Sequence, residues 1–372
     1  MNHIYYQTKT NKSNTGDILI NKILIHELRE YGRIHANCAL DVSAEFIRSL
    51  GLRPEENEQF KNEFGFVYSV LKNAIAARKA GDCVYVFSGP GDMYGGSWKL
   101  ALRNVISMFL FALLRLFGVT IVRIGRSFGP VTKVMAISEW MRSLGISHYY
   151  VRDSHSMERC RKMGIRKVKV CPDLSWAYRV GCESRAPQTN RVMVNLRGSV
   201  FGEKDAAFIE ATIRQSVSVL EELEKVMGVR PTVCVAHQVG TDRTFSKYVY
   251  KCLKDKFDVE FVEKRMMLED FERYYGSVDY HISNRMHSLL VGYKYGSLPI
   301  AVIDTKKHVK ISYTLKDCFL DALMVDIYDA QGSERVKELA ENRNMMLGQL
   351  RKCEEEKQLE LKAILDFIFF GA

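Results

Sequence analysis

The chain has 372 residues, of which 47% are hydrophobic and 26% are charged. This is the composition of a globular protein, and the length exceeds what one hydrophobic core usually holds, so we expect two domains and little disorder. The net charge of +10 favours anionic partners such as acidic lipid or a phosphorylated substrate. Its Lys and Arg residues are dispersed without interleaved aromatic residues, which argues against nucleic-acid binding.

The nine cysteines form no Cys-x-x-Cys pair, and most lie in apolar runs, as Cys83 and Cys234 do. This pattern is typical of buried free thiols in a reducing compartment and predicts neither a disulfide framework nor a zinc site. The first residues lack the apolar core of a signal peptide, so we expect a cytoplasmic protein. The apolar run 105–114 is too short to cross a bilayer, which takes about 20 residues, and it favours a buried helix over an interfacial one.

Short β-like runs alternate with amphipathic helical stretches along the chain. In the first half the predicted strands are residues 3–7, 83–88, 119–125, 148–152 and 168–171, and the predicted helices are 18–31, 60–79, 98–117, 131–144 and 154–163. A polar stretch at 181–190 predicts a linker. Beyond it we expect strands at 191–196, 232–236, 259–262, 279–283 and 300–303, helices at 205–227, 268–275 and 286–295, and a helical tail from residue 334. Alternation in both halves predicts an α/β fold with two parallel sheets, each covered by helices.

Ligands of such sheets bind at the carboxyl ends of the strands, so polar residues after predicted strands are candidates for an active site in the cleft between two lobes. Asn14, Gly16 and Asp17 follow the first strand and open a helix, whose free N–H groups suit an anion, although a simple turn capped by Asp17 or Thr15 is the favoured interpretation. Asp92 lies in the glycine-rich segment 88–96, which matches no dinucleotide or P-loop pattern and is equally well a substrate-lining loop or a plain turn. Arg126 follows the third strand.

The segment Ser283-Asn-Arg-Met-His-Ser-Leu-Leu290 follows a strand and opens a helix. Arg285 offers a guanidinium group suited to carboxylate or phosphate, and His287 can transfer a proton near neutral pH. Because both lie at a helix N-terminus, which favours an anion, a functional interpretation is stronger than a structural one. Arg197, which follows Asn195 at a strand end, is equally well a second cation for that anion or an ordinary surface arginine. No Asp-x-Asp, His-Glu-x-x-His or Gly-x-Ser-x-Gly motif occurs, so we expect chemistry without a metal or cofactor.

Four ordered motifs together resemble the polysaccharide pyruvyl transferase family. They cover residues 14–307 and are N-T-G-D, R-S-F-G-P, V-R-D-S-H-S with K-M-G-I-R-K-V-K-V-C-P-D-L-S-W, and S-N-R-M-H-S-L-L-V-G-Y-K-Y-G-S-L-P-I-A-V-I-D-T-K-K. The resemblance implies a fold like that of the two-lobed GT-B glycosyltransferases, with Rossmann-like domains at 1–184 on the acceptor side and 185–333 on the donor side. Residues 334–372 are then a helical tail that packs back on the lobes. The family often has a run of glycines where this chain has Ser88-Gly-Pro-Gly-Asp92.

The resemblance also implies transfer of a pyruvyl group from phosphoenolpyruvate to a sugar of a cell-surface polysaccharide, such as a capsule or exopolysaccharide, or to its lipid-linked precursor, as a ketal. The functional Arg-x-His element of the family falls here on Arg285 and His287, which we assign to catalysis. We assign donor binding to Arg197, Arg285, Asn195 and Ser288, and acceptor binding to Asn14, Gly16, Asp17, Asp92 and Arg126. A lipid-linked acceptor and the basic charge predict peripheral contact with an anionic membrane. The alternatives are a GT-B glycosyltransferase that uses a nucleotide sugar and a non-catalytic protein on the same fold.

Overall fold

The computed structural model describes residues 1–8, 12–38, 44–58, 60, 63–180, 189–199 and 205–371. By its internal contacts the chain divides into two compact units. Unit 1 comprises Met1–Lys12, Asp17–Leu174 and Gln358–Ala372, and unit 2 comprises Ser13–Gly16 and Ser175–Lys357. The main change of unit therefore precedes the predicted linker, of which residues 181–188 lie outside the described ranges.

Unit 1 is built on a parallel sheet whose strands, within the described residues, run in the order β3-β2-β1-β4-β6-β7-β8, with β5 paired to β6. The strands are β1 (Asn2–Gln7), β2 (Arg33–Asn37), β3 (Asn57–Glu58), β4 (Cys83–Ser88), β5 (Gly91–Gly95), β6 (Thr120–Val131), β7 (His148–Val151) and β8 (Val168–Val170). Part of the glycine-rich segment that we expected to be a loop or a turn is therefore a strand, because β5 pairs with β6.

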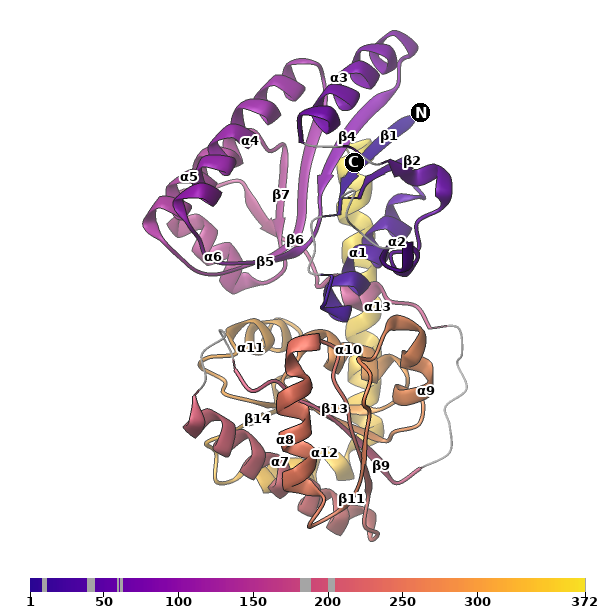
Figure 1. The fold of residues 1–372 in the computed structure, drawn as a ribbon, viewed down its shortest axis with the longest axis vertical. Coiled ribbons are helices and arrows are strands. Elements are labelled where there is room, and N and C mark those ends of the chain that lie inside the picture. The colour runs from indigo at the N-terminus through magenta and orange to yellow at the C-terminus, as the bar shows by residue number, and fades with distance from the viewer. Residues whose placement is uncertain are drawn as a thin grey trace. The chain divides into compact units, whose positions relative to one another are not determined.

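The helices of unit 1 are α1 (Thr15–Leu28), α2 (Ala44–Ser49), α3 (Glu63–Ala80), α4 (Trp98–Leu116), α5 (Lys133–Leu144) and α6 (Ser154–Lys162). Helix α3 packs against α4, and α4 packs against α5, so the three form a layer beside the sheet (Figure 1). The end of α13 (Arg343–Phe370) also belongs to unit 1, where Phe369 stacks on Tyr31 and Asp366 accepts a hydrogen bond from the Tyr31 hydroxyl at 2.7 Å.

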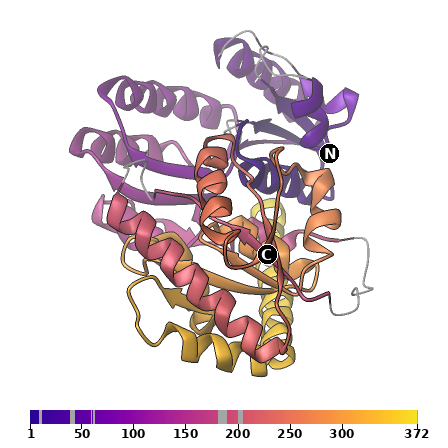
Figure 2. The ribbon, with the colours of Figure 1, turned by 60° about the horizontal axis from the view of Figure 1, so that its bottom comes forward.

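Unit 2 contains a parallel sheet whose described strands run in the order β11-β10-β9-β12-β13-β14. They are β9 (Arg191–Asn195), β10 (Thr232–Val235), β11 (Asp258–Phe261), β12 (Tyr280–Ser283), β13 (Leu298–Ile303) and β14 (Met324–Asp326). The helices are α7 (Ala206–Met227), α8 (Arg243–Leu253), α9 (Phe271–Tyr275), α10 (Met286–Lys294), α11 (Val309–Lys316), α12 (Gly332–Glu341) and the first part of α13. Helices α7 and α12 pack against each other and against this sheet (Figure 2).

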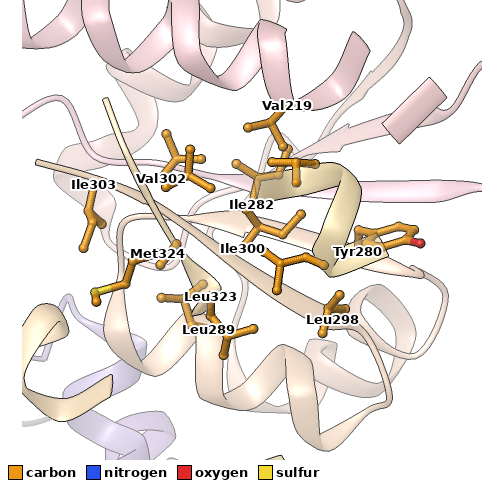
Figure 3. Packing of buried hydrophobic residues seen from close by; sticks show 14 of the residues in the cluster. Val219, Tyr280, Ile282, Leu289, Leu298, Ile300, Val302, Ile303, Leu323 and Met324 are labelled. Carbon is orange, nitrogen blue, oxygen red and sulfur yellow. The ribbon is translucent and has the colours of Figure 1, made fainter. Parts of the chain in front are cut away.

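The central strands of unit 2 are buried, and one face of them packs in an apolar core. Ile282 of β12 and Ile300 and Val302 of β13 are fully buried, with Val219 of α7 and Leu289 of α10 in the same cluster (Figure 3). Burial on both faces explains why these strands read as continuous apolar runs in the sequence.

The strand order reverses in the middle of each sheet. From β9 the chain moves outward through β10 and β11, and it then returns to the other side of β9 for β12, β13 and β14. In a doubly wound sheet the connections on the two sides of such a reversal lie on opposite faces, so the carboxyl ends of β9 and β12 are where a ligand is expected to bind. In unit 1 the equivalent reversal lies between β1 and β4.

No helix in the described part of the chain is both long enough and apolar enough to cross a membrane. The run 105–114 lies on α4, and its outer side is not buried, since Ile106, Phe109 and Leu113 expose 42%, 64% and 39% of their surface. Only Phe111 and Leu114 of this run are buried, so the expectation of a buried helix is wrong for most of the run. The cysteines of the described residues are free, although Cys83 is exposed and not buried as expected.

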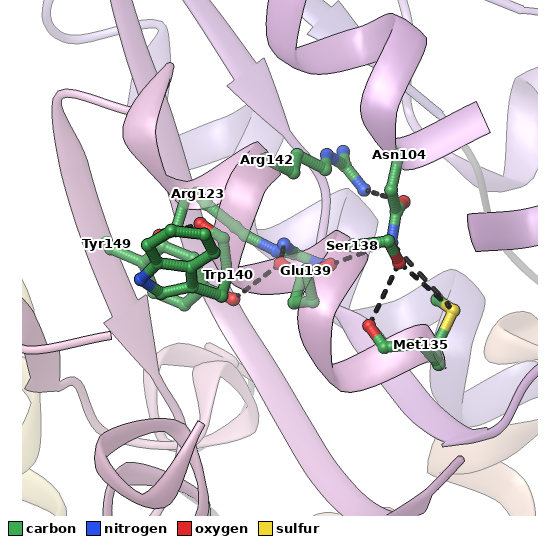
Figure 4. A network of polar contacts seen from close by, with 9 residues as sticks. Asn104, Arg123, Met135, Ser138, Glu139, Trp140, Arg142 and Tyr149 are labelled. Carbon is green, nitrogen blue, oxygen red and sulfur yellow. Dashed lines mark hydrogen bonds and ion pairs between the residues drawn. The ribbon is translucent and has the colours of Figure 1, made fainter. Parts of the chain in front are cut away.

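Glu139 joins α5 to the sheet of unit 1 through a buried polar network (Figure 4). It forms an ion pair with Arg123 of β6, and both side chains are fully buried. The Tyr149 hydroxyl donates to Glu139 at 2.8 Å, and the side-chain amide of Asn104 on α4 donates to it at 3.3 Å. Burial opposes ionisation of Glu139, but the positive charges of Arg123 and Arg142 outweigh it and lower the pKa of Glu139.

Replacing Glu139 by Gln tests this pair. At neutral pH, Glu139→Gln should lower the free energy of unfolding by about 3–5 kcal/mol, because Arg123 is left as a buried, unpaired charge. A carboxyl group whose pKa is lowered by folding stabilises the protein above its unfolded pKa, and this contribution is lost as the pH falls through the folded pKa. The difference in the free energy of unfolding between the variant and the wild type should therefore become smaller in acid. Urea unfolding at neutral and at acid pH measures this difference. The exposed Glu158→Gln, which loses only a surface pair with Lys162, should leave stability nearly unchanged; equal losses in both variants would contradict the role of the pair.

Candidate active site

The predicted cationic residues follow two neighbouring strands in the centre of the second sheet. Strands β9 and β12 pair in parallel, with Asn195 aligned to Ser283. The Ser283 hydroxyl donates to the carbonyl oxygen of Asn195 at 2.6 Å and accepts from the backbone N–H of Arg285 at 3.0 Å. Arg197 and Arg285 each lie two residues beyond the end of a central strand, at the same edge of the sheet.

Asn284 fixes the chain after β9 beside the chain after β12. Its Oδ1 accepts from the backbone N–H of Arg197 at 2.8 Å, and its Nδ2 donates to the carbonyl oxygen of Arg197 at 3.0 Å. Asn284 is buried, so these two bonds satisfy an amide that water cannot reach. The local sequence points to its neighbour Arg285 but not to Asn284, because an amide that hydrogen-bonds to a distant backbone leaves no local pattern.

Two further residues that the sequence analysis missed surround the arginines. Asp242, just before α8, forms an ion pair with Arg285; burial raises the pKa of Asp242, and the charges of Arg285 and Arg197 only partly offset this. Burial, together with the charge of Arg197, lowers the pKa of His308 to about 3, so His308 is neutral at neutral pH. Both guanidinium groups act on this buried carboxylate, and arginines gathered in this way suit an anionic ligand.

Helix α10 begins directly after Arg285, which takes the N-cap position with an extended backbone, φ −119° and ψ 120°. Arg285 therefore precedes the first helical turn, in which His287 lies, and does not belong to a face of the helix. His287 is buried and lies against Gly16: a Cβ atom on Gly16 would be 2.4 Å from Nδ1 of His287. This contact leaves room only for glycine at position 16.

The segment Ser13–Gly16 is attached to unit 2 by hydrogen bonds. The backbone N–H of Thr15 donates to the carbonyl oxygen of Gln238 at 3.1 Å, and its hydroxyl donates to the carbonyl oxygen of Met266 at 2.8 Å. The Asn14 side chain accepts from the backbone N–H of Gly16 at 3.1 Å and so caps the start of α1. The capped turn that the sequence favoured is present, but its cap is Asn14 and not Asp17 or Thr15 as expected. This turn brings Gly16 to the candidate catalytic histidine.

The predicted acceptor residues divide between the units. Asn14 and Gly16 belong to unit 2 with His287, whereas Asp17, Asp92 and Arg126 belong to unit 1. The Asp92 carboxylate accepts a hydrogen bond from the buried guanidinium of Arg152 at 3.0 Å, and Arg152 also pairs with Asp173 at 3.1 Å. Asp92 is thus part of an internal ion-pair network of unit 1.

Arg126 lies within β6 and not after the strand as expected, and its environment differs from that of Asp92. Its Nε is buried and has no hydrogen-bond partner among the described residues. Burial, together with the positive charges of Arg123 and Arg142, lowers the pKa of Arg126 to about 9. An anionic group beside this guanidinium would counter the repulsion, so the site around Arg126 favours an acidic ligand.

Ser288 takes part in a buried network whose hydrogen bonds engage its hydroxyl completely. Gln238 donates to the Tyr275 hydroxyl at 2.7 Å, Tyr275 donates to Ser288 at 2.8 Å, and the amide of Asn195 also donates to Ser288 at 3.0 Å. Ser288 is also hydrogen-bonded to Nε2 of His281 at 3.0 Å, and burial lowers the pKa of His281 to about 3, which keeps this ring neutral. One donated and two accepted bonds fill the capacity of a hydroxyl. This geometry favours a role for Ser288 and Asn195 in positioning α10 over the predicted direct contact with the donor.

Within the described ranges, no group of three or more His, Cys, Asp or Glu side chains is arranged to hold a metal ion. The side chains gathered beside the N-terminus of α10 can bind an anion and transfer a proton.

Solved structures of epimerases and glycosyltransferases share this fold. UDP-GlcNAc 2-epimerase from Neisseria meningitidis, bound to UDP-GlcNAc, matches with a TM-score of 0.51 and 10% identity over 98% of this chain and 100% of that chain. UGT89C1 from Arabidopsis thaliana, complexed with UDP-L-rhamnose, has a TM-score of 0.54 and 9% identity over 99% of this chain and 98% of that chain. A glycosyltransferase from Rickettsia africae has a TM-score of 0.53 and 10% identity over 99% and 97%. This likeness confirms the expected GT-B-like α/β fold with two Rossmann-like units.

The comparison with protein families identifies the chain more closely. The family model described as polysaccharide pyruvyl transferase matches residues 14–296, well over half of the chain. This protein therefore belongs to the polysaccharide pyruvyl transferase family, as its motifs suggested. No curated protein matches it at a significant level.

The contact between Gly16 and His287 leads to a test of the site. Gly16→Ala should displace the His287 ring, and misplacing a catalytic group by about 1 Å can lower turnover by about 10²-fold. Turnover in pyruvyl transfer and the melting temperature should be measured on the same preparation. Gly348→Ala is the control, since an added Cβ there meets nothing within 4 Å. A Gly16→Ala protein with normal turnover would show that the position of His287 is not needed.

Proposed function

We propose that this protein transfers the pyruvyl group of phosphoenolpyruvate to a sugar of a cell-surface polysaccharide, or of its lipid-linked precursor, and forms a ketal. The observation that supports this best is the position of Arg197 and Arg285 after the ends of two adjacent strands, beside the N-terminus of α10. Phosphoenolpyruvate carries a phosphate and a carboxylate, and guanidinium groups and helix N-termini suit both.

The reaction defines what the side chains must do. One sugar hydroxyl oxygen bonds to C2 of phosphoenolpyruvate while C3 takes up a proton; the C2–O bond to phosphate then breaks with its electron pair, and the second hydroxyl oxygen closes the ketal. One hydroxyl proton balances the proton taken by C3, and the other leaves with inorganic phosphate. We assign a proton transfer to His287 and stabilisation of the departing phosphate to Arg197 and Arg285. No cofactor takes part in this scheme.

On the acceptor side, Arg126 supports an acidic acceptor. Its buried Nε has no partner among the described residues, and its pKa is lowered by burial and, to a lesser extent, by the positive charges of Arg123 and Arg142. A phosphate or carboxylate on the acceptor would supply the missing negative charge. Asn14, Gly16, Asp17 and Asp92 remain the other proposed acceptor residues.

The solved structures bound to UDP-GlcNAc and UDP-L-rhamnose favour one alternative, a glycosyltransferase with a nucleotide-sugar donor. The two functions can be distinguished by the donor that the protein binds. Phosphoenolpyruvate should raise the melting temperature, whereas UDP-GlcNAc should not, and mass spectrometry of lipid-linked or aryl glycosides should find a pyruvate ketal after incubation with phosphoenolpyruvate. Stabilisation by UDP-GlcNAc alone, with no ketal formed, would replace pyruvyl transfer by glycosyl transfer.

The donor assignment predicts the effect of removing Arg197. Arg197→Ala should weaken phosphoenolpyruvate binding by about 1.5–3 kcal/mol, the usual worth of a charge-assisted contact, with the fold retained. Arg285→Ala should weaken it similarly but should also destabilise the protein, because Asp242 is left buried without its partner. Titration calorimetry measures the affinity. Arg230→Ala, which removes an exposed guanidinium from the same unit, is the control for net charge. Unchanged affinity in both site variants would remove the arginines from the donor site.

The proton-transfer assignment predicts a different result for His287. His287→Ala should lower turnover by about 10²–10⁴-fold, the usual share of general acid–base catalysis, while donor affinity changes much less than in the arginine variants. Turnover and melting temperature should again be measured on one sample. A destabilised variant whose folded fraction is fully active would make His287 a structural residue.

A further inference from the structure

Helices α4 and α5 lie side by side in unit 1 and expose apolar side chains (Figure 1). These residues recur every three or four positions, which places them on one stripe of each helix. On α4 they are Trp98, Leu102, Ile106, Phe109, Leu113 and Leu116, and on α5 they are Val134, Ile137, Trp140 and Leu144. We call these residues the α4–α5 face.

The α4–α5 face is more exposed than scattered surface residues explain. Trp98, Phe109, Leu116 and Ile137 expose 67%, 64%, 79% and 60% of their surface. Single exposed apolar residues are common, but contiguous stripes on two adjacent helices mark a surface that another apolar phase covers.

The inner side of α5 has the opposite polarity. The buried residues of this helix are Met135, Ser138, Glu139 and Ser143, and Asn104 on the inner side of α4 joins the same network (Figure 4). A surface helix in water normally buries its apolar side and exposes its polar side. Helix α5 does the reverse, and the ion pair between Glu139 and Arg123 fixes it in this orientation.

The charges around the α4–α5 face indicate what kind of apolar partner covers it. Lys99, Arg103, Arg115 and Lys133 are exposed on these two fully described helices, and their one acidic residue, Glu139, is buried in its ion pair. Basic groups beside an apolar face complement an anionic lipid surface. A two-fold contact with a second copy would instead bring these basic groups together, which disfavours a dimer through this face.

We propose that the α4–α5 face docks the protein on a membrane that contains anionic phospholipid. The two helices would lie in the plane of the interface, with Trp98 and Trp140 at the level of the headgroups, where tryptophan is favoured. None of these residues is assigned to the donor, to the acceptor or to proton transfer, so the inference is independent of the proposed reaction.

Sedimentation of the full chain with vesicles tests the docking surface. The protein should sediment with vesicles of phosphatidylcholine and phosphatidylglycerol at low salt, and less with pure phosphatidylcholine or at high salt. Each basic residue near an anionic surface contributes about fivefold to binding, so the triple variant Lys99→Gln, Arg103→Gln, Lys133→Gln should bind on the order of 100-fold more weakly.

A second triple variant tests the apolar part. Leu102→Gln, Phe109→Gln and Ile137→Gln replace exposed side chains and should lower vesicle binding by at least about tenfold at low salt. The matched control replaces exposed aromatic residues of unit 2, namely Tyr248→Gln, Phe319→Asn and Tyr328→Gln, and should bind like wild type. Asn suits position 319, where φ is 55°. Activity on a soluble aryl glycoside should stay the same in all these variants.

Tryptophan fluorescence gives a measurement that does not depend on these substitutions. Lipids with brominated acyl chains should quench the emission of Trp98 and Trp140 but not that of Trp176, which is buried in unit 2. A Trp98→Phe, Trp140→Phe protein, in which only Trp176 emits, should therefore lose the quenching.

Four results would each overturn the proposal. The first is wild-type protein that stays in the supernatant at low salt, and the second is an apolar triple variant that binds vesicles like wild type. The third is a wild-type dimer, seen by light scattering, that the apolar triple variant dissociates, because a second copy would then cover the face. Absence of quenching in vesicle-bound wild type would equally contradict it.

Discussion

The candidate site depends on the reversal of strand order between β9 and β12. Because this reversal sends the connections to opposite faces of the sheet, the chain segments after Asn195 and Ser283 end side by side. Each arginine is anchored differently: Asp242 pairs with Arg285, and the side-chain amide of Asn284 hydrogen-bonds to the backbone of Arg197. The candidate site is therefore organised by contacts within unit 2.

A second constraint acts on His287, because Gly16 lies close against its side chain. The hydrogen bonds of Thr15 to the carbonyl oxygens of Gln238 and Met266 fasten this segment to unit 2, although the rest of α1 belongs to unit 1. The N-terminal motif and the Arg-x-His element, far apart in the sequence, thereby form one local structure. Together with the family membership, this arrangement is the physical basis for assigning the chemistry to unit 2.

In unit 1 a buried ion pair decides which side of a helix meets the solvent. Glu139 is held by Arg123, so α5 turns its polar residues inward and leaves Val134, Ile137 and Leu144 outside. A soluble enzyme gains nothing in stability from such exposure, whereas an enzyme that collects a lipid-linked acceptor would use the surface to stay at the membrane. The membrane contact expected from the basic charge and a lipid-linked acceptor is thus assigned, in our proposal, to the α4–α5 face.

Local sequence determined the alternation of strands and helices, the bounds of β4 and the start of α10 after Arg285, because buried strands and helix starts have short-range signatures. It missed α8 and α11, and it missed Asp242, Asn284 and His308, whose roles exist only through partners distant in the sequence. The run 105–114 was recognised as apolar, but which of its residues are buried depends on how α4 and α5 are anchored. Hydrophobicity and periodicity are properties of a segment, whereas charge compensation, close approach to a glycine and the orientation of a helix arise between segments, and only the tertiary structure decided them.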